Sequence, residues 1–177
     1  MKIKRLNLII LTACTLLAVS VFTFWGYEGK ERQAFYCKKA LSGDKLIVFD
    51  GRKEQVVRLV GVDAPDLSGE PGEPDEFYSQ EALGYLKERV EGQELYLEFA
   101  EPKLDVFNQW RAYVYLPDGA FLNLELIKQG WAAVFNYYQF SERREFLIAQ
   151  HQAQQSRRGM WQGWTGRFSV IGRKATP

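Results

Sequence analysis

Histidine and cysteine are scarce in this sequence, which excludes several classes of catalytic and metal site. His151 is the one histidine among 177 residues, so a zinc cluster cannot be built, and the sequence shows no Ser-His-Asp grouping around it. We interpret it as a residue on the surface of a helix. Of the two cysteines, Cys14 lies in a strongly apolar segment and Cys37 lies beyond it. We therefore expect no disulfide framework, and we expect Cys37 to be a small strand residue.

A surplus of positive charge is missing as well. The formal net charge is +1, and three of the 23 cations fall within the first five residues, which leaves 20 cations against 22 anions in the remainder. A protein that binds nucleic acid by neutralising phosphates alone is normally basic. Any contact with phosphate must therefore depend on a local site.

One long hydrophobic run is present, near the N-terminus. Leu6–Trp25 follows a short basic head, and at about 1.5 Å per residue this run is long enough to cross a hydrocarbon core of roughly 30 Å. Trp25 and Tyr27 stand where interfacial aromatic anchors are expected, and the basic head should stay in the cytoplasm. We interpret residues 1–27 as an N-terminal transmembrane helix and residues 28–33 as a linker, with the following domain outside the cytoplasm and anchored to the membrane.

Two other interpretations of this segment stay open. Ala18-Val19-Ser20 has the small residues of a signal-peptidase site, and cleavage there would give a secreted protein. Leu11-Thr12-Ala13-Cys14 is similar to a bacterial lipobox, with Cys14 as the lipidated residue. All three interpretations export the domain to the periplasm or the extracellular space.

The rest of the chain predicts short strands with interspersed helices. Strand patterns occupy residues 33–41, 45–49, 54–62, 94–99 and 111–116, and helical patterns occupy residues 78–90, 121–129 and 142–156. Asp50-Gly51 predicts a hairpin turn, and Ser141 is expected to be the N-cap of the last helix. This order indicates a small α+β barrel, of which the five-stranded OB-fold is one example.

Acids and an arginine gather at the ends of the predicted strands. Asp44 opens the second strand, while Arg58 and Asp63 lie at the end of the third, where a long acidic loop over residues 63–77 begins. Two carboxylates and nearby carbonyls suit a hard cation such as Ca²⁺. An arginine beside them can stabilise the charge of a phosphoryl transition state. Solvated turn residues produce the same pattern, so the pattern alone leaves the role of this site undecided.

The stretch Arg58–Asp66 (RLVGVDAPD) resembles the core motif of the staphylococcal nuclease (thermonuclease) family, in which an arginine is followed after four residues by Asp, Thr or Ala, Pro and Glu. Other stretches resemble the family's motifs in the same order: Ser42–Asp44, Gln80–Ala82, Ala112–Tyr115, Asn123–Ala132 and Arg158–Trp161. The resemblance runs from about Phe35 to Trp161, which is nearly the whole part of the chain beyond the apolar run.

This resemblance implies a five-stranded OB-fold barrel with three helices over residues 34–161, followed by a tail over residues 162–177. It also implies Ca²⁺-dependent hydrolysis of DNA and RNA, and we expect a monomer.

The resemblance also implies roles for individual residues. Asp44 and Asp63 would supply carboxylates to Ca²⁺, and the backbone carbonyl of Ala64 would be a third ligand. Arg58 would hold the phosphate, and Asp66, in the place of the family's glutamate, would orient or deprotonate the attacking water.

Several positions depart from the family's pattern. Ser42 replaces an acid and Lys45 replaces the usual threonine, so less negative charge faces the metal. Asp66 is one methylene shorter than glutamate, and a misplacement of about 1–1.5 Å can cost on the order of 100-fold in rate. Gln109 stands where a phosphate-binding arginine is expected. Arg111, two residues on and about 6.8 Å along the same face of the strand, is our candidate for a partial substitute.

Two functions are therefore expected. The first is an exported Ca²⁺-dependent nuclease acting on DNA or RNA, weakened by these substitutions. The second is a catalytically impaired OB-fold module that binds nucleic acid or protein at the membrane. The first requires that Asp44, Asp63 and Arg58 converge on one pocket.

Overall fold

The computed structural model describes residues 31–68, 74–135 and 137–162. The element order is β1 (Gln33–Ser42), β2 (Lys45–Phe49), β3 (Glu54–Leu59), β4 (Val62–Asp63), α2 (Ser79–Val90), β5 (Glu94–Leu104), β6 (Trp110–Tyr115), α3 (Leu122–Gln129), β7 (Ala133–Val134), α4 (Arg143–Gln155) and a 3₁₀ turn, η1 (Gly159–Trp161). The expected transmembrane helix, the first half of the linker and nearly all of the tail lie outside the described residues. Among the residues that are described, no helix is both long and apolar enough to cross a membrane.

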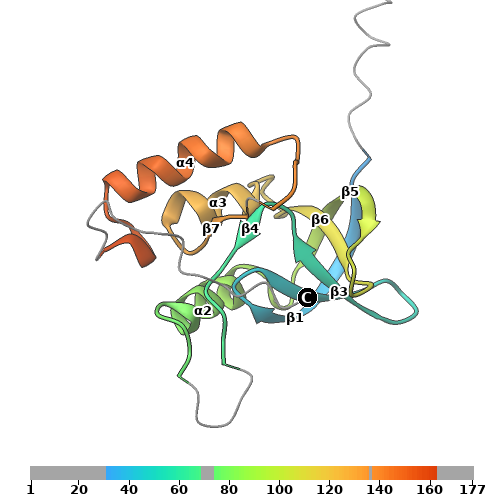
Figure 1. Ribbon diagram of the computed structural model, residues 1–177. Helices are drawn as coiled ribbons and strands as arrows, with labels where there is room; N and C mark the ends of the chain where they lie inside the picture. Colours follow the sequence, from blue (N-terminus) through green and yellow to red (C-terminus); the bar gives the residue numbers. More distant parts are fainter. Residues whose placement is uncertain (1–30, 69–73, 136, 163–177) are drawn as a thin grey trace, which may run out of the picture. The chain divides into compact units, whose positions relative to one another are not determined.

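Five strands close into a barrel in the order β1-β2-β3-β6-β5. β3 and β6 run parallel, while the other neighbouring pairs of the barrel are antiparallel. In Figure 1 these strands lie to one side and α2, α3 and α4 lie to the other. The expected α+β fold, a five-stranded OB-like barrel with three helices, is confirmed.

The interior of the barrel follows from the alternation of side chains along each strand. Leu46 and Val48 on β2 are fully buried, as are Val57 and Leu59 on β3. Cys37 on β1 is also fully buried, which confirms its expected place in a strand, and burial raises the pKa of its thiol to about 11. The Cys37 thiol therefore stays protonated and unreactive at neutral pH.

The hairpin between β2 and β3 forms at the expected turn. The Asp50 carboxylate accepts hydrogen bonds from the backbone N–H groups of Arg52 (2.9 Å) and Lys53 (2.8 Å), and Gly51 adopts a φ of 89°. These bonds to an exposed carboxylate lower the pKa of Asp50 to about 2. A turn with positive φ needs glycine, which explains why Asp-Gly marks it in the sequence.

The prediction of a single strand over residues 54–62 is wrong in the length of the strand. β3 ends at Leu59, and Gly61, with a φ of 75°, turns the chain before the short strand β4. β4 leaves the barrel and pairs with β7 instead. A side chain on Gly61 would lie 2.6 Å from the ring of Phe140, so tertiary packing fixes this bend. The bend carries Asp63 away from the line of β3.

α2 and α3 pack on the barrel through their apolar faces, α2 against β1 and α3 against β6, and α4 packs on α3. The expectation that Ser141 caps α4 is wrong, because the helix begins at Arg143 with Glu142 as its N-cap residue and no side-chain capping hydrogen bond. Helix termini are the least certain feature of a sequence pattern, and a shift of one residue is enough to displace a cap.

Candidate active site

Arg58 and Asp44 form the centre of the candidate site. The Asp44 side chain is buried, and its Oδ2 lies 3.7 Å from Nη2 of Arg58. The other carboxylate oxygen accepts a 2.6 Å hydrogen bond from the Ser42 hydroxyl, and the Asp44 carbonyl accepts one of 3.0 Å from the N–H of Leu59. The turn between β1 and β2 is thus fixed against the end of β3, with a buried carboxylate beside a guanidinium.

Gly43 brings this turn against the segment that carries Asp63 and Ala64. A Cβ added to Gly43 would lie 2.6 Å from the Cβ of Ala64 and 2.9 Å from that of Ala82, so only glycine permits the approach. Asp63 is half-buried at the end of β4, and Ala64 is buried. The structure therefore brings Asp44, Arg58 and the Asp63–Ala64 segment together.

Asp66 lies in the loop after this segment and is tied to Glu76 at the other end of the loop. Its backbone N–H donates to Oε2 of Glu76 at 2.9 Å, and the Glu76 N–H donates to the Asp66 carbonyl at 3.0 Å. Glu76 is a residue that the sequence reasoning did not single out. It fixes the backbone of Asp66, the residue in the place of the family's glutamate.

Arg111 lies directly beside Arg58, because the two residues are partners in the parallel pairing of β3 with β6. Nη1 of Arg111 donates to the Pro102 carbonyl at 3.2 Å, and its guanidinium carbon lies 4.3 Å from the centre of the Tyr138 ring. The guanidinium of Arg58 lies 5.1 Å from the ring centre of Phe135, and the two rings are 4.9 Å apart. Two neighbouring arginines therefore lie over two neighbouring aromatic rings, an arrangement stabilised by cation–π attraction.

Gln109 lies in the turn before β6, where its backbone N–H donates to Oδ1 of Asp105 at 2.8 Å. Its Oε1 atom is buried and has no hydrogen-bond partner among the described residues. Gln109 thus lies one residue before β6, which starts at Trp110. Arg111 does not need to reach back along the strand, since its pairing already places it next to Arg58.

The sequence marked Lys45 only as a replacement for the usual threonine and did not place it beside Arg58. Lys45 is the residue directly opposite Arg58 in the antiparallel pairing of β2 with β3. The sequence shows only that Lys45 follows Asp44; its position beside Arg58 depends on the register between strands. The sequence likewise carries no local signal for the contact between Tyr138 and Arg111.

The donors that the sequence predicts for a cation are two carboxylates and a carbonyl. Among the residues that the structure describes, no three histidine, cysteine or acidic side chains form a cluster that could hold a metal ion. Asp44, Asp63 and the Ala64 carbonyl are all oxygen donors, which suit Ca²⁺, an ion that fills its remaining positions with water. The residues thus fit a hard cation held partly by solvent.

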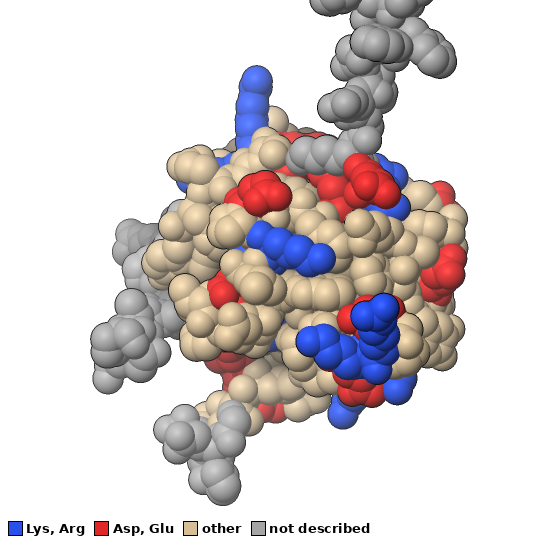
Figure 2. Space-filling model, turned by 90° about the vertical axis from the view of Figure 1, so that its right-hand side faces the viewer, with Lys and Arg blue, Asp and Glu red and all other residues tan. Residues whose placement is uncertain are grey.

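One face of the molecule carries charges of both signs and shows no broad positive surface (Figure 2). On the face drawn in Figure 2, Lys and Arg side chains are interspersed with Asp and Glu within a larger uncharged area. This view agrees with the near-neutral composition of the chain. Attraction of a polyanion must come from a few cations in defined positions.

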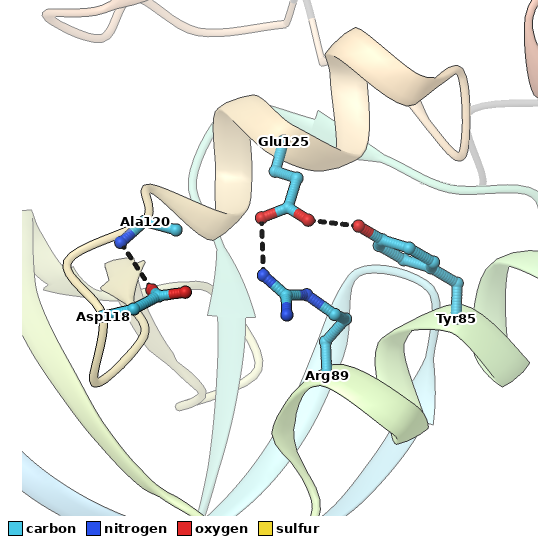
Figure 3. A network of polar contacts seen from close by, with 5 residues as sticks. All are labelled: Tyr85, Arg89, Asp118, Ala120 and Glu125. Atoms are coloured by element: carbon cyan, nitrogen blue, oxygen red, sulfur yellow. Dashed lines mark hydrogen bonds and ion pairs between the residues drawn. The ribbon is translucent and has the colours of Figure 1, made fainter.

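A separate polar network joins α2 to α3 (Figure 3). The carboxylate of Glu125 accepts a short hydrogen bond from the Tyr85 hydroxyl and one of 3.1 Å from Nη2 of Arg89. Burial and this hydrogen bond raise the pKa of Tyr85. In the turn before α3, Asp118 accepts a 2.9 Å hydrogen bond from the N–H of Ala120. The network fixes the relative position of two helices that flank the barrel.

Comparison with known proteins agrees with this arrangement. Residues 56–163 match the model of the family described as staphylococcal nuclease homologue. The chain is 32% identical to a thermonuclease of Staphylococcus hyicus over 139 residues, which cover 77% of this chain and 80% of that protein. It is 26% identical to a thermonuclease of Staphylococcus intermedius over 169 residues, which cover 90% and 99% of the two chains.

A third relative comes from outside the staphylococci. The chain is 29% identical over 123 residues to an uncharacterized endonuclease of Escherichia coli O157:H7, a match that covers 70% of this chain and 73% of that protein. The family match includes Arg58 on β3 and Arg111 on β6. It also includes the Asp63–Asp66 segment, which begins at the end of β4. The barrel and these matches identify the chain as a member of the staphylococcal nuclease family.

Proposed function

We propose that this chain is a nuclease that hydrolyses phosphodiester bonds of DNA or RNA with the help of Ca²⁺. The observation that carries the proposal is the juxtaposition of the buried Asp44 carboxylate with Arg58, which itself lies beside Arg111. A buried carboxylate can hold a cation, and paired guanidinium groups can hold a phosphate beside that cation. The relatives named thermonuclease and endonuclease support the same reaction class.

Each residue of the site would have a distinct part in this reaction. Asp44, Asp63 and the Ala64 carbonyl would hold Ca²⁺, which when bound would offset negative charge on the phosphate. Arg58 would donate two hydrogen bonds to the phosphate and stabilise the additional charge of the transition state. Asp66 would orient the attacking water and accept its proton, with its backbone fixed by Glu76.

Arg111 would take over part of the role of the arginine that Gln109 replaces. Its guanidinium lies over Tyr138 and next to Arg58, so it offers a cation to the same phosphate. Gln109 can donate a hydrogen bond but cannot neutralise charge. Because Asp66 is also shorter than glutamate, we expect slower turnover than a site with both arginines and the glutamate would give.

A second candidate function is a module that binds nucleic acid or protein at the membrane without hydrolysing it. The observation that favours it is the position of Gln109 in the turn before β6, where the expected second arginine is absent. In this case Arg58 and Arg111 would bind phosphate without catalysis.

The apolar run Leu6–Trp25 supports export, with the domain held at the outer face of the membrane as a monomer. Protease added to cells whose outer membrane, where there is one, has been permeabilised should then degrade the domain. Protection of the domain until the cytoplasmic membrane is broken would contradict export.

Activity of the full chain toward labelled DNA and RNA tests the proposed reaction. We expect hydrolysis with Ca²⁺, none after addition of a chelator, and a loss of about 10³-fold in Arg58→Ala. Arg52→Ala, a change at an exposed arginine in the β2–β3 turn, is the matched control and should keep full activity. If the full chain binds oligonucleotide but never cleaves it, the second candidate function replaces the first.

A further inference from the structure

Three cations occupy one row across three adjacent strands of the barrel. Lys45 on β2 lies directly opposite Arg58 on β3, and Arg58 lies directly opposite Arg111 on β6. Residues paired in this way point to the same face of a sheet, and neighbouring strands are about 4.8 Å apart. The row therefore extends over about 10 Å on the outer wall of the barrel.

Like charges directly opposite each other destabilise a sheet, so this row needs a compensating anion. Asp44 provides one negative charge, 3.7 Å from Arg58. Within the described part of the chain, neither Lys45 nor Arg111 forms an ion pair. Lys38 on β1, by contrast, is paired with Glu54 at 2.8 Å. Positive charge is thus left unbalanced at this row in a protein body that otherwise carries more acids than bases.

The two arginines of the row are held in place, while the lysine is adaptable. Arg58 and Arg111 lie over the rings of Phe135 and Tyr138, and Arg111 is also held by the Pro102 carbonyl. Holding these groups before a ligand arrives reduces the entropy lost on binding. Lys45 is half-buried at the start of β2, and its ammonium group is a compact charge on a flexible stem that can follow a neighbouring phosphate.

We infer that Lys45 is a phosphate-binding residue and that the row Lys45–Arg58–Arg111 holds the backbone of a single-stranded nucleic acid over more than one phosphate. Lys45 adds a cation at one end of the row and so offsets the charge lost at Gln109. The inference rests on the proposed function in that nucleic acid is the ligand. It does not require that the bound strand be cleaved.

The salt dependence of binding tests this role, because each cation that neutralises a phosphate of a single strand adds about 0.7 to the slope of log affinity against log salt. The full chain is titrated with fluorescent oligo(dT) in the presence of chelator, so that binding is measured without hydrolysis. For Lys45→Gln we expect a slope whose magnitude is smaller by about 0.7. When the salt concentration rises fourfold, the fold-loss of affinity of this variant should therefore be about 2.6 times smaller than that of the wild type. Lys45→Arg should keep the wild-type slope.

Lys87→Gln is the matched control, since Lys87 is an exposed lysine on α2 and should not affect the slope. Lys45→Met, which keeps the aliphatic stem, replaces Lys45→Gln if the latter fails to fold. Equal slopes for the neutral Lys45 variants and the control overturn the inference, as does a wild type that binds no oligo(dT). If the wild type hydrolyses nucleic acid and the neutral Lys45 variants keep its slope, the role of Lys45 is wrong and the proposed reaction stands. If the neutral Lys45 variants have a reduced slope and the wild type hydrolyses nothing, the proposed reaction is wrong and the role of Lys45 stands.

Discussion

At the scale of single residues, the buried side-chain amide of Asn123 connects α3 to two other backbone segments. Its Oδ1 accepts a 2.8 Å hydrogen bond from the N–H of Val114, and its Nδ2 donates to the carbonyls of Val60 (2.9 Å) and Ala112 (3.3 Å). Val60 follows the end of β3, and the other two residues belong to β6. The side chain thus satisfies backbone groups where α3 covers the seam between two strands.

Replacing Asn123 by alanine should therefore cost about 2–4 kcal/mol of unfolding free energy, because buried backbone groups lose their partners. Urea denaturation of the two proteins measures the difference. Gln129→Ala, at the exposed end of the same helix, should stay within about 0.5 kcal/mol of the wild type. A loss below about 1 kcal/mol for Asn123→Ala would mean that water replaces the amide.

Arg111 and Gln109 provide a second test at the same scale. Since Arg111 lies beside Arg58 and Gln109 lies in the preceding turn, we expect Arg111→Ala to lower turnover by about 10- to 100-fold, part of the effect of an arginine on a transferred phosphate. Gln109→Ala should leave turnover nearly unchanged. Both rates are measured on labelled DNA with Ca²⁺. Unchanged turnover in Arg111→Ala would remove Arg111 from the proposed reaction.

At the scale of elements, the contact between α2 and α3 depends on a titratable group. Burial and the hydrogen bond to Glu125 raise the pKa of Tyr85 above its ordinary value of 10.0. A raised pKa means that the folded protein holds this proton more tightly than the unfolded chain does. The stability from Tyr85 is therefore fully present below pH 10 and is lost as the pH rises above 10.

Tyr85→Phe should lower the unfolding free energy at pH 7 by about 1–2 kcal/mol, the contribution of a hydrogen bond to a charged partner. Above pH 10 the variant should also lose stability less steeply than the wild type. The pKa of Tyr113 is raised as well, by burial and by a hydrogen bond to Glu142, so part of the alkaline loss persists. Tyr137→Phe, a change at an exposed tyrosine, should match the wild type in urea denaturation across this range. Parallel pH profiles for Tyr85→Phe and wild type would contradict this account.

The turn that carries Asp44 is a second element whose position can be changed. Gly43→Ala would press a methyl group against Ala64 and Ala82, and such overpacking costs about 1–3 kcal/mol. Because the turn must move away from the Asp63–Ala64 segment, we expect the Ca²⁺ concentration for half-maximal hydrolysis to rise about tenfold, the result of a shift on the order of 1 Å.

Gly84→Ala is the control for Gly43→Ala, since a Cβ at position 84 meets open space within α2. It should raise the unfolding free energy by up to about 1 kcal/mol and leave the Ca²⁺ requirement unchanged. If Gly43→Ala lowers the melting temperature but keeps the wild-type Ca²⁺ titration, the turn has no part in holding the cation.

At the scale of the whole molecule, local signals predicted most of the elements. Asp50-Gly51 marked the hairpin, and apolar spacing marked the three helices. The break after Leu59 was missed because the bend at Gly61 depends on Phe140, which is distant in sequence. The sequence also predicted that Arg58 lies near Asp44, and the two side chains are 3.7 Å apart.

The row of cations could not be predicted from local signals. Lys45 and Arg111 join the site only through the registers of β2 with β3 and of β3 with β6. No local pattern encodes these registers.

The parallel seam between β3 and β6 has a consequence for synthesis of the protein. Arg58 and Arg111 are 53 positions apart in the chain, and a parallel pair of strands requires such a long connection. A nascent chain that ends before β6 carries one arginine without its neighbour. Because such a chain cannot close the barrel, we expect it to bind the nucleic acids of the cell that translates it more weakly than the complete domain does.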